Sequence, residues 1–166
     1  MNGAFENIYC ENLCYISRMF LDHKCLDASI ECFFFYVLTL VQEDGFHFLG
    51  YFSKDRLRTE NQLNNLSCIM VLPCFQKGGY GKTIVEMSYA LSMKEKKPGT
   101  PERPLSDLGH RMYVNFWTRR VVKVLLDYVE KNSYTEITLK NISERTGMIE
   151  DDIIYILKHH NIRRGQ

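Results

Sequence analysis

Apolar positions follow two different periods along the chain, and together they predict a fold of the α+β class. In three segments they recur every three or four positions, as in amphipathic helices: residues 12–21, 83–94 and 107–128. Three other segments are apolar runs rich in aromatic and β-branched residues, which predicts buried strands: residues 30–41, 47–52 and 65–72. The short connection between the first two strands favours an antiparallel pair. The polar residues at 53–64 are expected to form an exposed loop.

Two short helical segments joined by a glycine are predicted near the end of the chain. Thr138 is expected to cap the first helix, and Gly147 to turn the chain into the second. This shape is typical of DNA-binding modules, but the second helix begins with three acidic residues at 150–152, which would repel phosphate. Direct DNA binding is therefore not favoured. We expect a core at residues 1–130 and a helix-turn-helix-like lobe at residues 131–166.

The composition is that of a globular protein with little excess of either charge. Of the 166 residues 45% are hydrophobic, and 21 basic residues against 20 acidic ones give a formal charge of +1. This excludes a protein that wraps a polyanion with its whole surface. The apolar run Cys32–Gln42 is short of the roughly 20 residues that a membrane-spanning helix needs. Because the N-terminus also lacks a secretory pattern, an intracellular protein with no membrane association is expected.

Six cysteines are present, and none of their spacings matches a zinc knuckle or a thioredoxin-type site. Reduced thiols are therefore expected. Cys10, Cys14 and His23 are residue types that could bind a metal together. Two cysteines with separate structural roles are the favoured alternative. No metal is assigned.

A glycine-rich loop, Gln-Lys-Gly-Gly-Tyr-Gly-Lys at residues 76–82, lies between the third predicted strand and the helix after it. Glycines let the backbone approach a ligand, and the amides at a helix start favour a phosphate. A plain strand-to-helix turn would use the same residues. The loop matches neither the dinucleotide fingerprint nor a complete P-loop.

Wider similarity comes from ordered segments along the chain. They are residues 65–73, 76–82 and Pro-Glu-Arg-Pro-Leu-Ser-Asp-Leu-Gly at 101–109, with residues 8–14, 20–24 and 50–54. Together they resemble the MYST histone acetyltransferases. The resemblance implies a GNAT-like core with a mixed sheet that binds acetyl-CoA, followed by the helical lobe. It also implies a nuclear protein-lysine acetyltransferase, with histone tails as substrate and subunits of a chromatin complex as partners.

The same resemblance assigns roles to individual residues. Glu102 corresponds to the general base, which the reaction needs because a lysine is almost wholly ammonium at neutral pH. Cys68 corresponds to the active-site cysteine, which either carries the acetyl group or lines the site, and direct transfer is favoured. Lys24 corresponds to the lysine that the family autoacetylates. The cofactor contacts are expected at Ile69, Met70, Val71, Gln76, Lys77, Gly78, Gly79, Tyr80, Gly81, Lys82, Ser106 and Asn115.

Departures from the family pattern leave a second hypothesis open. Val71 stands where the family usually has threonine, and Asn115 where it has serine, so cofactor affinity is expected to differ more than binding mode. The zinc finger that ordinarily precedes the segment at residues 8–14 has no counterpart here, so a reduced form or a fragment is expected. The alternative is a catalytically inactive or regulatory interaction module of a chromatin complex.

Overall fold

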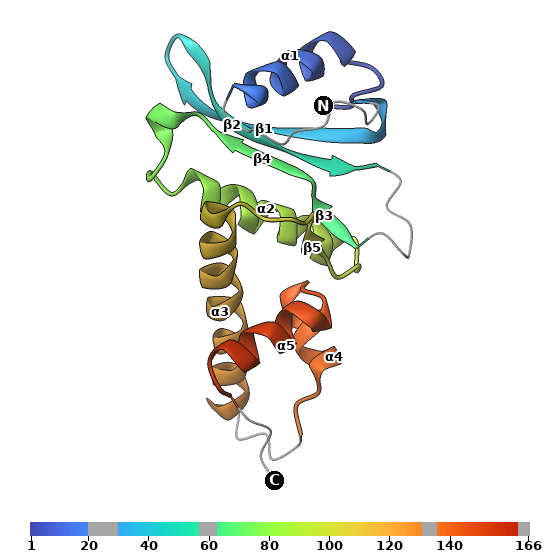
Figure 1. Cartoon of the computed structure of the whole chain (residues 1–166), viewed down its shortest axis with the longest axis vertical. Coiled ribbons are helices and arrows are strands. Elements are labelled where there is room, and N and C mark those ends of the chain that lie inside the picture. The colour runs from blue at the N-terminus through green and yellow to red at the C-terminus, as the bar shows by residue number, and fades with distance from the viewer. Residues whose placement is uncertain (20–29, 57–62, 131–135, 163–166) are drawn as a thin grey trace. The chain divides into compact units, whose positions relative to one another are not determined.

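The computed structural model of this chain has the alternating helices and strands of an α+β protein, which confirms the predicted class (Figure 1). It describes residues 1–19, 30–56, 63–130 and 136–162. The chain divides into two compact units, Met1–Ile84 and Val85–Gln166. The functional boundary expected after residue 130 falls at the end of a helix within the second unit, and it stays a prediction.

The first unit is built on a three-stranded sheet in the order β1–β2–β4, with both pairs antiparallel. Its strands are β1 (Phe33–Gln42), β2 (Gly45–Asp55) and β4 (Cys68–Val71), and the 3₁₀ turn η1 (Ile30–Cys32) precedes β1. β1 and β2 form the predicted hairpin, in which Gly45 has a φ of 134° that only glycine adopts readily.

Two strand boundaries differ from those that the sequence predicted. β2 continues through residues 53–55, placed by the sequence in a loop, because these residues pair with the first residues of β1. The strand expected at 65–72 is divided into β3 (Asn64–Leu66) and β4. The break is at Ser67, whose N–H donates to the Ser53 carbonyl at 2.8 Å.

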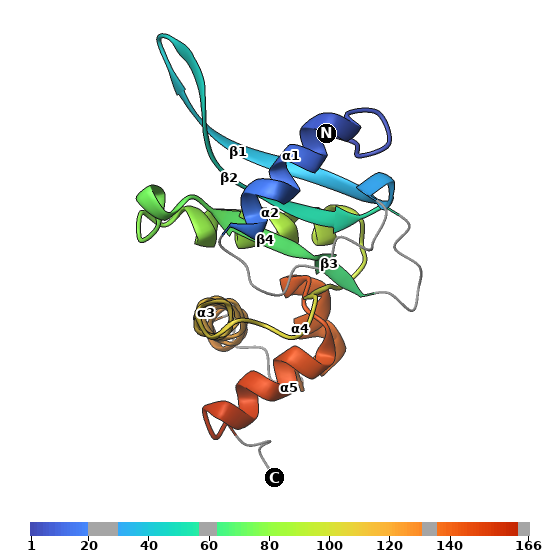
Figure 2. The same cartoon turned by 45° about the horizontal axis from the view of Figure 1, so that its top comes forward.

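Helix α1 (Asn7–Arg18) packs on one face of this sheet (Figures 1 and 2). Its buried residues Cys10, Leu13 and Cys14 join Phe35, Tyr51 and Met70 of the strands in one apolar cluster. Burial raises the pKa of Cys10. Cys10 and Cys14, the two cysteines of the metal site considered from the sequence, are thus residues of the apolar core. Among the described residues no three metal-ligating side chains cluster, and His23 lies outside those residues.

Gly50 allows β2 and β4 to approach closely at the point where the glycine-rich loop leaves the sheet. It pairs with Val71, the last residue of β4. A Cβ atom at Gly50 would lie 2.3 Å from the carbonyl oxygen of Met70, a distance that real Cβ atoms do not show. The absence of a side chain at residue 50 therefore sets the spacing of the strand that carries the predicted cofactor contacts.

The second unit is helical. It contains most of α2 (Tyr80–Lys94), together with the short strand β5 (Thr100–Pro101), α3 (Asp107–Glu130), α4 (Leu139–Thr146) and α5 (Glu150–His159). α4 and α5 pack against α3 and against each other. As predicted, Thr138 caps α4, accepting the Asn141 N–H, and Gly147 ends it with a φ of 73°. None of the described helices is long and apolar enough to cross a membrane.

The face of α2 that the sequence indicated is buried, with Met87 as the exception. The apolar pattern put Ile84, Met87 and Leu91 on this face, with Val85 and Ser88 beside it. Ile84, Val85 and Ser88 are buried, whereas Met87 is 47% exposed. Burial of Ser88 is possible because its hydroxyl donates to the Val85 carbonyl at 2.8 Å. A serine that bonds to its own helix can thus replace an apolar residue at a buried position.

Candidate functional site

The strand β4 presents the first group of predicted site residues. Met70 is 4% exposed and belongs to the cluster under α1, so only its backbone is available to a ligand. Ile69 and Val71, which point to the opposite face of the strand, are half-buried. This alternation means that a cofactor beside β4 would meet backbone groups and two apolar side chains.

The shape of the glycine-rich loop after β4 depends on a hydrogen bond from the Gln76 side chain and on two residues with left-handed backbone. The chain first makes the 3₁₀ turn η2 (Pro73–Phe75). The amide of Gln76 then donates back to the Val71 carbonyl at 3.1 Å. Lys77 and Gly79 have φ angles of 67° and 86°. These bonds and angles reverse the chain direction and start α2 at Tyr80, three residues earlier than expected.

The loop therefore presents a helix N-terminus at an exposed turn. The first amides of an α-helix have no partner in the helix, and the helix dipole favours an anion beside them. Residues 76–79 are exposed, and nothing lies within 4 Å of a Cβ placed on Gly79. The predicted contacts Tyr80, Gly81 and Lys82 form the first turn of α2. These features fit a phosphate group, and hence the pyrophosphate of a coenzyme A thioester.

Cys68 lies at the start of β4, next to a buried chain of hydroxyl groups. Its Sγ is 3.8 Å from the hydroxyl of Tyr51, which lies 2.6 Å from the hydroxyl of Ser17. The Ser17 hydroxyl donates its one proton to the Leu13 carbonyl at 3.0 Å, because a carbonyl can only accept. The Ser17 oxygen is then free to accept the Tyr51 proton, and in the contact between Tyr51 and Cys68 either group can be the donor. Burial raises the pKa of Tyr51, and a negative charge on Cys68 raises it further, so this hydroxyl stays protonated in either state of the thiol.

Glu102 lies in the second unit, at the point where the chain passes from buried to exposed residues. Thr100 and Pro101 before it are buried, whereas Glu102 and Arg103 are exposed. A guanidinium nitrogen of Arg103 donates to Asp152 of α5 at 2.8 Å. The Glu102 carboxylate is therefore accessible on a segment whose backbone is anchored.

Ser106 and Asn115 are also in the second unit. The Ser106 hydroxyl accepts the Gly109 N–H at 3.1 Å, and its carbonyl accepts the His110 N–H at 2.7 Å. Ser106 is thus the N-cap of α3, a structural role that explains its presence without a ligand. Asn115 is exposed on α3. Lys24, expected to be modified, lies outside the described residues.

Two features near the predicted site were not found from the sequence. The first is the Ser17–Tyr51 pair beside Cys68. The second is Asp152, which the sequence treated only as part of an acidic helix start, and which is 1% exposed. Burial raises the pKa of Asp152, and Arg103 partly offsets that effect. This carboxyl therefore favours the folded state most at low pH, and the contribution is lost as pH rises through the raised pKa.

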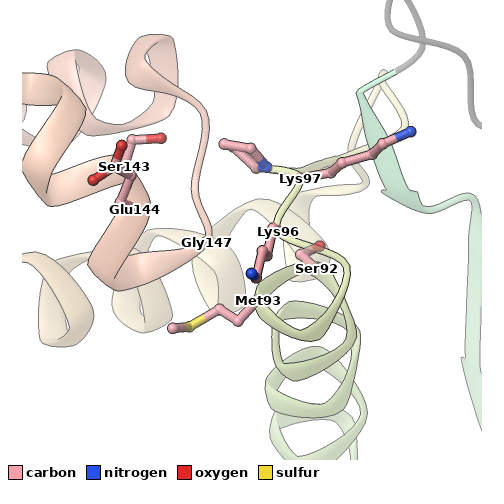
Figure 3. Close-up of a pocket in the computed structure, with 8 residues that line it drawn as sticks. Ser92, Met93, Lys96, Lys97, Ser143, Glu144 and Gly147 are labelled. Carbon is pink, nitrogen blue, oxygen red and sulfur yellow. The ribbon is translucent and has the colours of Figure 1, made fainter.

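A cavity of about 290 Å³ opens elsewhere in the second unit (Figure 3). Ser143 and Glu144 of α4 line one side, and Met93 of α2 and Lys96, which follows that helix, line the other. None of the predicted catalytic or cofactor residues lines it.

The chain belongs to the MOZ/SAS (MYST) family, which it matches over residues 1–165. It is 44% identical over 165 residues to histone acetyltransferase KAT6B of Mus musculus, covering 99% of this chain and 8% of that protein. It is 43% identical over 169 residues to a putative MYST-like histone acetyltransferase 1 of Oryza sativa subsp. japonica, covering 100% of this chain and 36% of that protein. It is 41% identical over 158 residues to a histone acetyltransferase Tip60 homologue of Caenorhabditis elegans, covering 95% of this chain and 34% of that protein. The chain therefore spans at most about a third of the length of these relatives.

Proposed function

We propose that this chain is the catalytic region of a protein-lysine acetyltransferase that moves the acetyl group of acetyl-CoA to lysines of histone tails. The observation that carries the proposal is the family match over residues 1–165, with relatives named histone acetyltransferases that are 44% and 43% identical over nearly the whole chain. A nuclear location and association with chromatin-complex subunits follow from that substrate.

Acetyl-CoA is expected to lie along β4 with its pyrophosphate over the loop at residues 76–82. The exposed turn, the α2 N-terminus and the open space at Gly79 support this placement. Ile69, Met70 and Val71 would contribute backbone contacts. The bound thioester supplies the activated acetyl group.

Glu102 is proposed to take the proton that the substrate lysine must lose. The uncharged amine attacks the thioester carbonyl and forms a C–N bond, and the carbonyl–sulfur bond breaks. The coenzyme leaves as a thiolate, which takes up the second proton that the nitrogen loses as the amide forms. An exposed carboxylate on an anchored backbone suits this role, because a base must reach a lysine on another molecule while keeping its geometry.

Cys68 is proposed to line the site as a neutral thiol instead of carrying the acetyl group. A covalent acetyl-cysteine requires a thiolate nucleophile. The hydrogen-bond chain from Leu13 through Ser17 and Tyr51 supports a thiol whose proton is directed at the Tyr51 oxygen. As long as the Ser17 hydroxyl donates to Leu13, loss of the Cys68 proton would place a negative charge against a lone pair of the Tyr51 oxygen. The arrangement favours direct transfer from acetyl-CoA to lysine.

We expect Cys68→Ser to retain turnover within about tenfold, because a serine hydroxyl can also donate to Tyr51 and direct transfer needs no thiolate. The measurement is kcat for acetylation of a histone peptide, with Cys68→Ala as the matched variant that cannot donate. A loss of about 10³-fold or more in both variants, together with a hydroxylamine-sensitive label on Cys68 of the unmodified chain, would instead establish an acetyl-cysteine intermediate.

The function itself is tested by transfer of radiolabel from acetyl-CoA to core histones, with acetyl-CoA affinity measured separately by equilibrium dialysis. Labelled histone lysines support the proposal. Saturable acetyl-CoA binding without transfer would favour the inactive interaction module suggested by the departure at Val71. Absence of both would contradict either hypothesis.

A further inference from the structure

The segment that carries Glu102 is attached at both ends to the C-terminal lobe, defined as α4, α5 and the turn between them. Before Glu102, the N–H of Gly99 donates to the Gly147 carbonyl at 2.8 Å. After Glu102, Nη2 of Arg103 donates to Oδ1 of Asp152 at 2.8 Å. All of these residues lie in the second unit. Both attachments of the segment therefore come from the lobe whose shape first suggested DNA binding.

Asp152 is the buried partner of this ion pair and Arg103 the exposed one. The side chain of Arg103 is 55% exposed and that of Asp152 is 2% exposed. The acidic neighbours of Asp152 at residues 150–151 are exposed, so a favourable charge at the start of α5 does not require burial. Burying a carboxylate is costly unless it is paired. The guanidinium of Arg103 also lies 5.9 Å from the ring centre of Trp117, which limits its orientations.

We propose that Asp152 is a positioning residue for the acetyl transfer, acting through Arg103 to hold the backbone of Glu102 in its reactive place. This inference rests on the proposed role of Glu102 as the base. The side chain of Glu102 is exposed, so its position is set mainly by its backbone. Pro101 and Pro104 restrict the φ angles on either side, and the Arg103–Asp152 pair removes much of the freedom that is left. A displacement of about 1 Å at a reacting group can lower a rate about 100-fold.

A structural ion pair alone would predict lower stability without a specific effect on proton transfer. A double-mutant cycle between Arg103→Met and Glu102→Gln separates the two roles. In the full chain, Arg103→Met is expected to lower kcat for a histone peptide about 10- to 100-fold, with acetyl-CoA affinity unchanged within twofold. In the Glu102→Gln background the same substitution is expected to have almost no further effect, because the base that it positions is already gone.

Two matched variants accompany the cycle. Asp152→Asn keeps an oxygen that can accept from Arg103 and is expected to retain kcat within about fivefold. Asp151→Asn removes an exposed charge from the same turn of α5 and is expected to leave kcat unchanged. If Arg103→Met does not fold, the double-mutant cycle is measured with Arg103→Lys, which keeps the positive charge but loses the planar guanidinium group.

The outcomes distinguish this inference from the proposed function. Turnover that is unaffected by Glu102→Gln overturns the base, and the positioning role with it. Suppose instead that Glu102→Gln lowers kcat as expected. If Arg103→Met then lowers kcat equally with and without Glu102→Gln, or does not lower it at all, only the role of Asp152 is overturned. Hydrogen exchange of residues 96–106 gives a readout that does not depend on turnover. Faster exchange in Arg103→Met and not in Asp151→Asn supports anchoring, and unchanged exchange contradicts it.

Discussion

Replacing Glu102 by glutamine is expected to lower turnover at pH 7 by about 10²- to 10⁴-fold while acetyl-CoA binding is retained. Glutamine has nearly the same size and still accepts hydrogen bonds, but it cannot take a proton. Only about one lysine in 2,500 is uncharged at pH 7, since the amine has a pKa near 10.4. Without a base, the variant depends on this small fraction.

The pH dependence makes this prediction specific. Below the pKa of the substrate amine, each unit of pH raises the uncharged fraction about tenfold. The deficit of Glu102→Gln should therefore shrink as pH rises from 7 to 9.5, whereas a deficit caused by misfolding would not. The measurement is kcat across that range, beside Glu136→Gln as an exposed control of the same chemistry. Equal rates for Glu102→Gln and the unmodified chain at pH 7 would show that another group removes the proton.

Trp117→Ala is expected to lower the free energy of unfolding by about 3–5 kcal/mol. The indole is 1% exposed and lies 5.3 Å, centre to centre, from the ring of Tyr113. Its N–H donates to the buried hydroxyl of Tyr89 at 2.7 Å. Alanine would leave a cavity and remove that donor. Domains have only about 5–15 kcal/mol of total stability, so the loss is a large share of it.

The measurement for this variant is urea unfolding monitored by circular dichroism. Tryptophan fluorescence cannot be used, because Trp117 is the only tryptophan in the sequence. Trp117→Phe should cost less, about 1–3 kcal/mol, since a ring remains in the core. Leu126→Ala serves as the control on the same helix, where the side chain is 55% exposed, and should change stability by less than about 0.5 kcal/mol. A change below about 1 kcal/mol for Trp117→Ala would mean that the site collapses around the missing ring.

Much of the local structure could be predicted because it depends on neighbours in the sequence. Thr138 and Gly147 bound α4 as expected, since capping and left-handed turns are chemistry of single residues. The start of α2 was placed three residues late, because Gly81 was assigned to the loop on glycine content and helix propensity alone does not fix a boundary. Within α2, Met87 departs from the face that the apolar pattern indicated and is 47% exposed.

The partners around the candidate site could not be predicted, because they are distant in sequence. Ser17 and Tyr51 are 34 residues apart, and Arg103 and Asp152 are 49 residues apart. Neither separation corresponds to a motif, so a single sequence gives no sign that the two residues of a pair are in contact. From the sequence, the acidic run at residues 150–152 was interpreted only as a charged helix start, and the packing of α5 is what shows that its last member is buried.

The hydrogen-bond chain that ends at Cys68 also bears on oxidation. Peroxides and disulfides react with a thiolate, and a thiol whose proton is held in a hydrogen bond reacts slowly. As the neutral thiol proposed above, Cys68 is expected to be a poor target for sulfenic acid formation although it is partly exposed. An acetyl transfer that leaves this sulfur neutral would continue under oxidative stress that inactivates enzymes with a cysteine nucleophile.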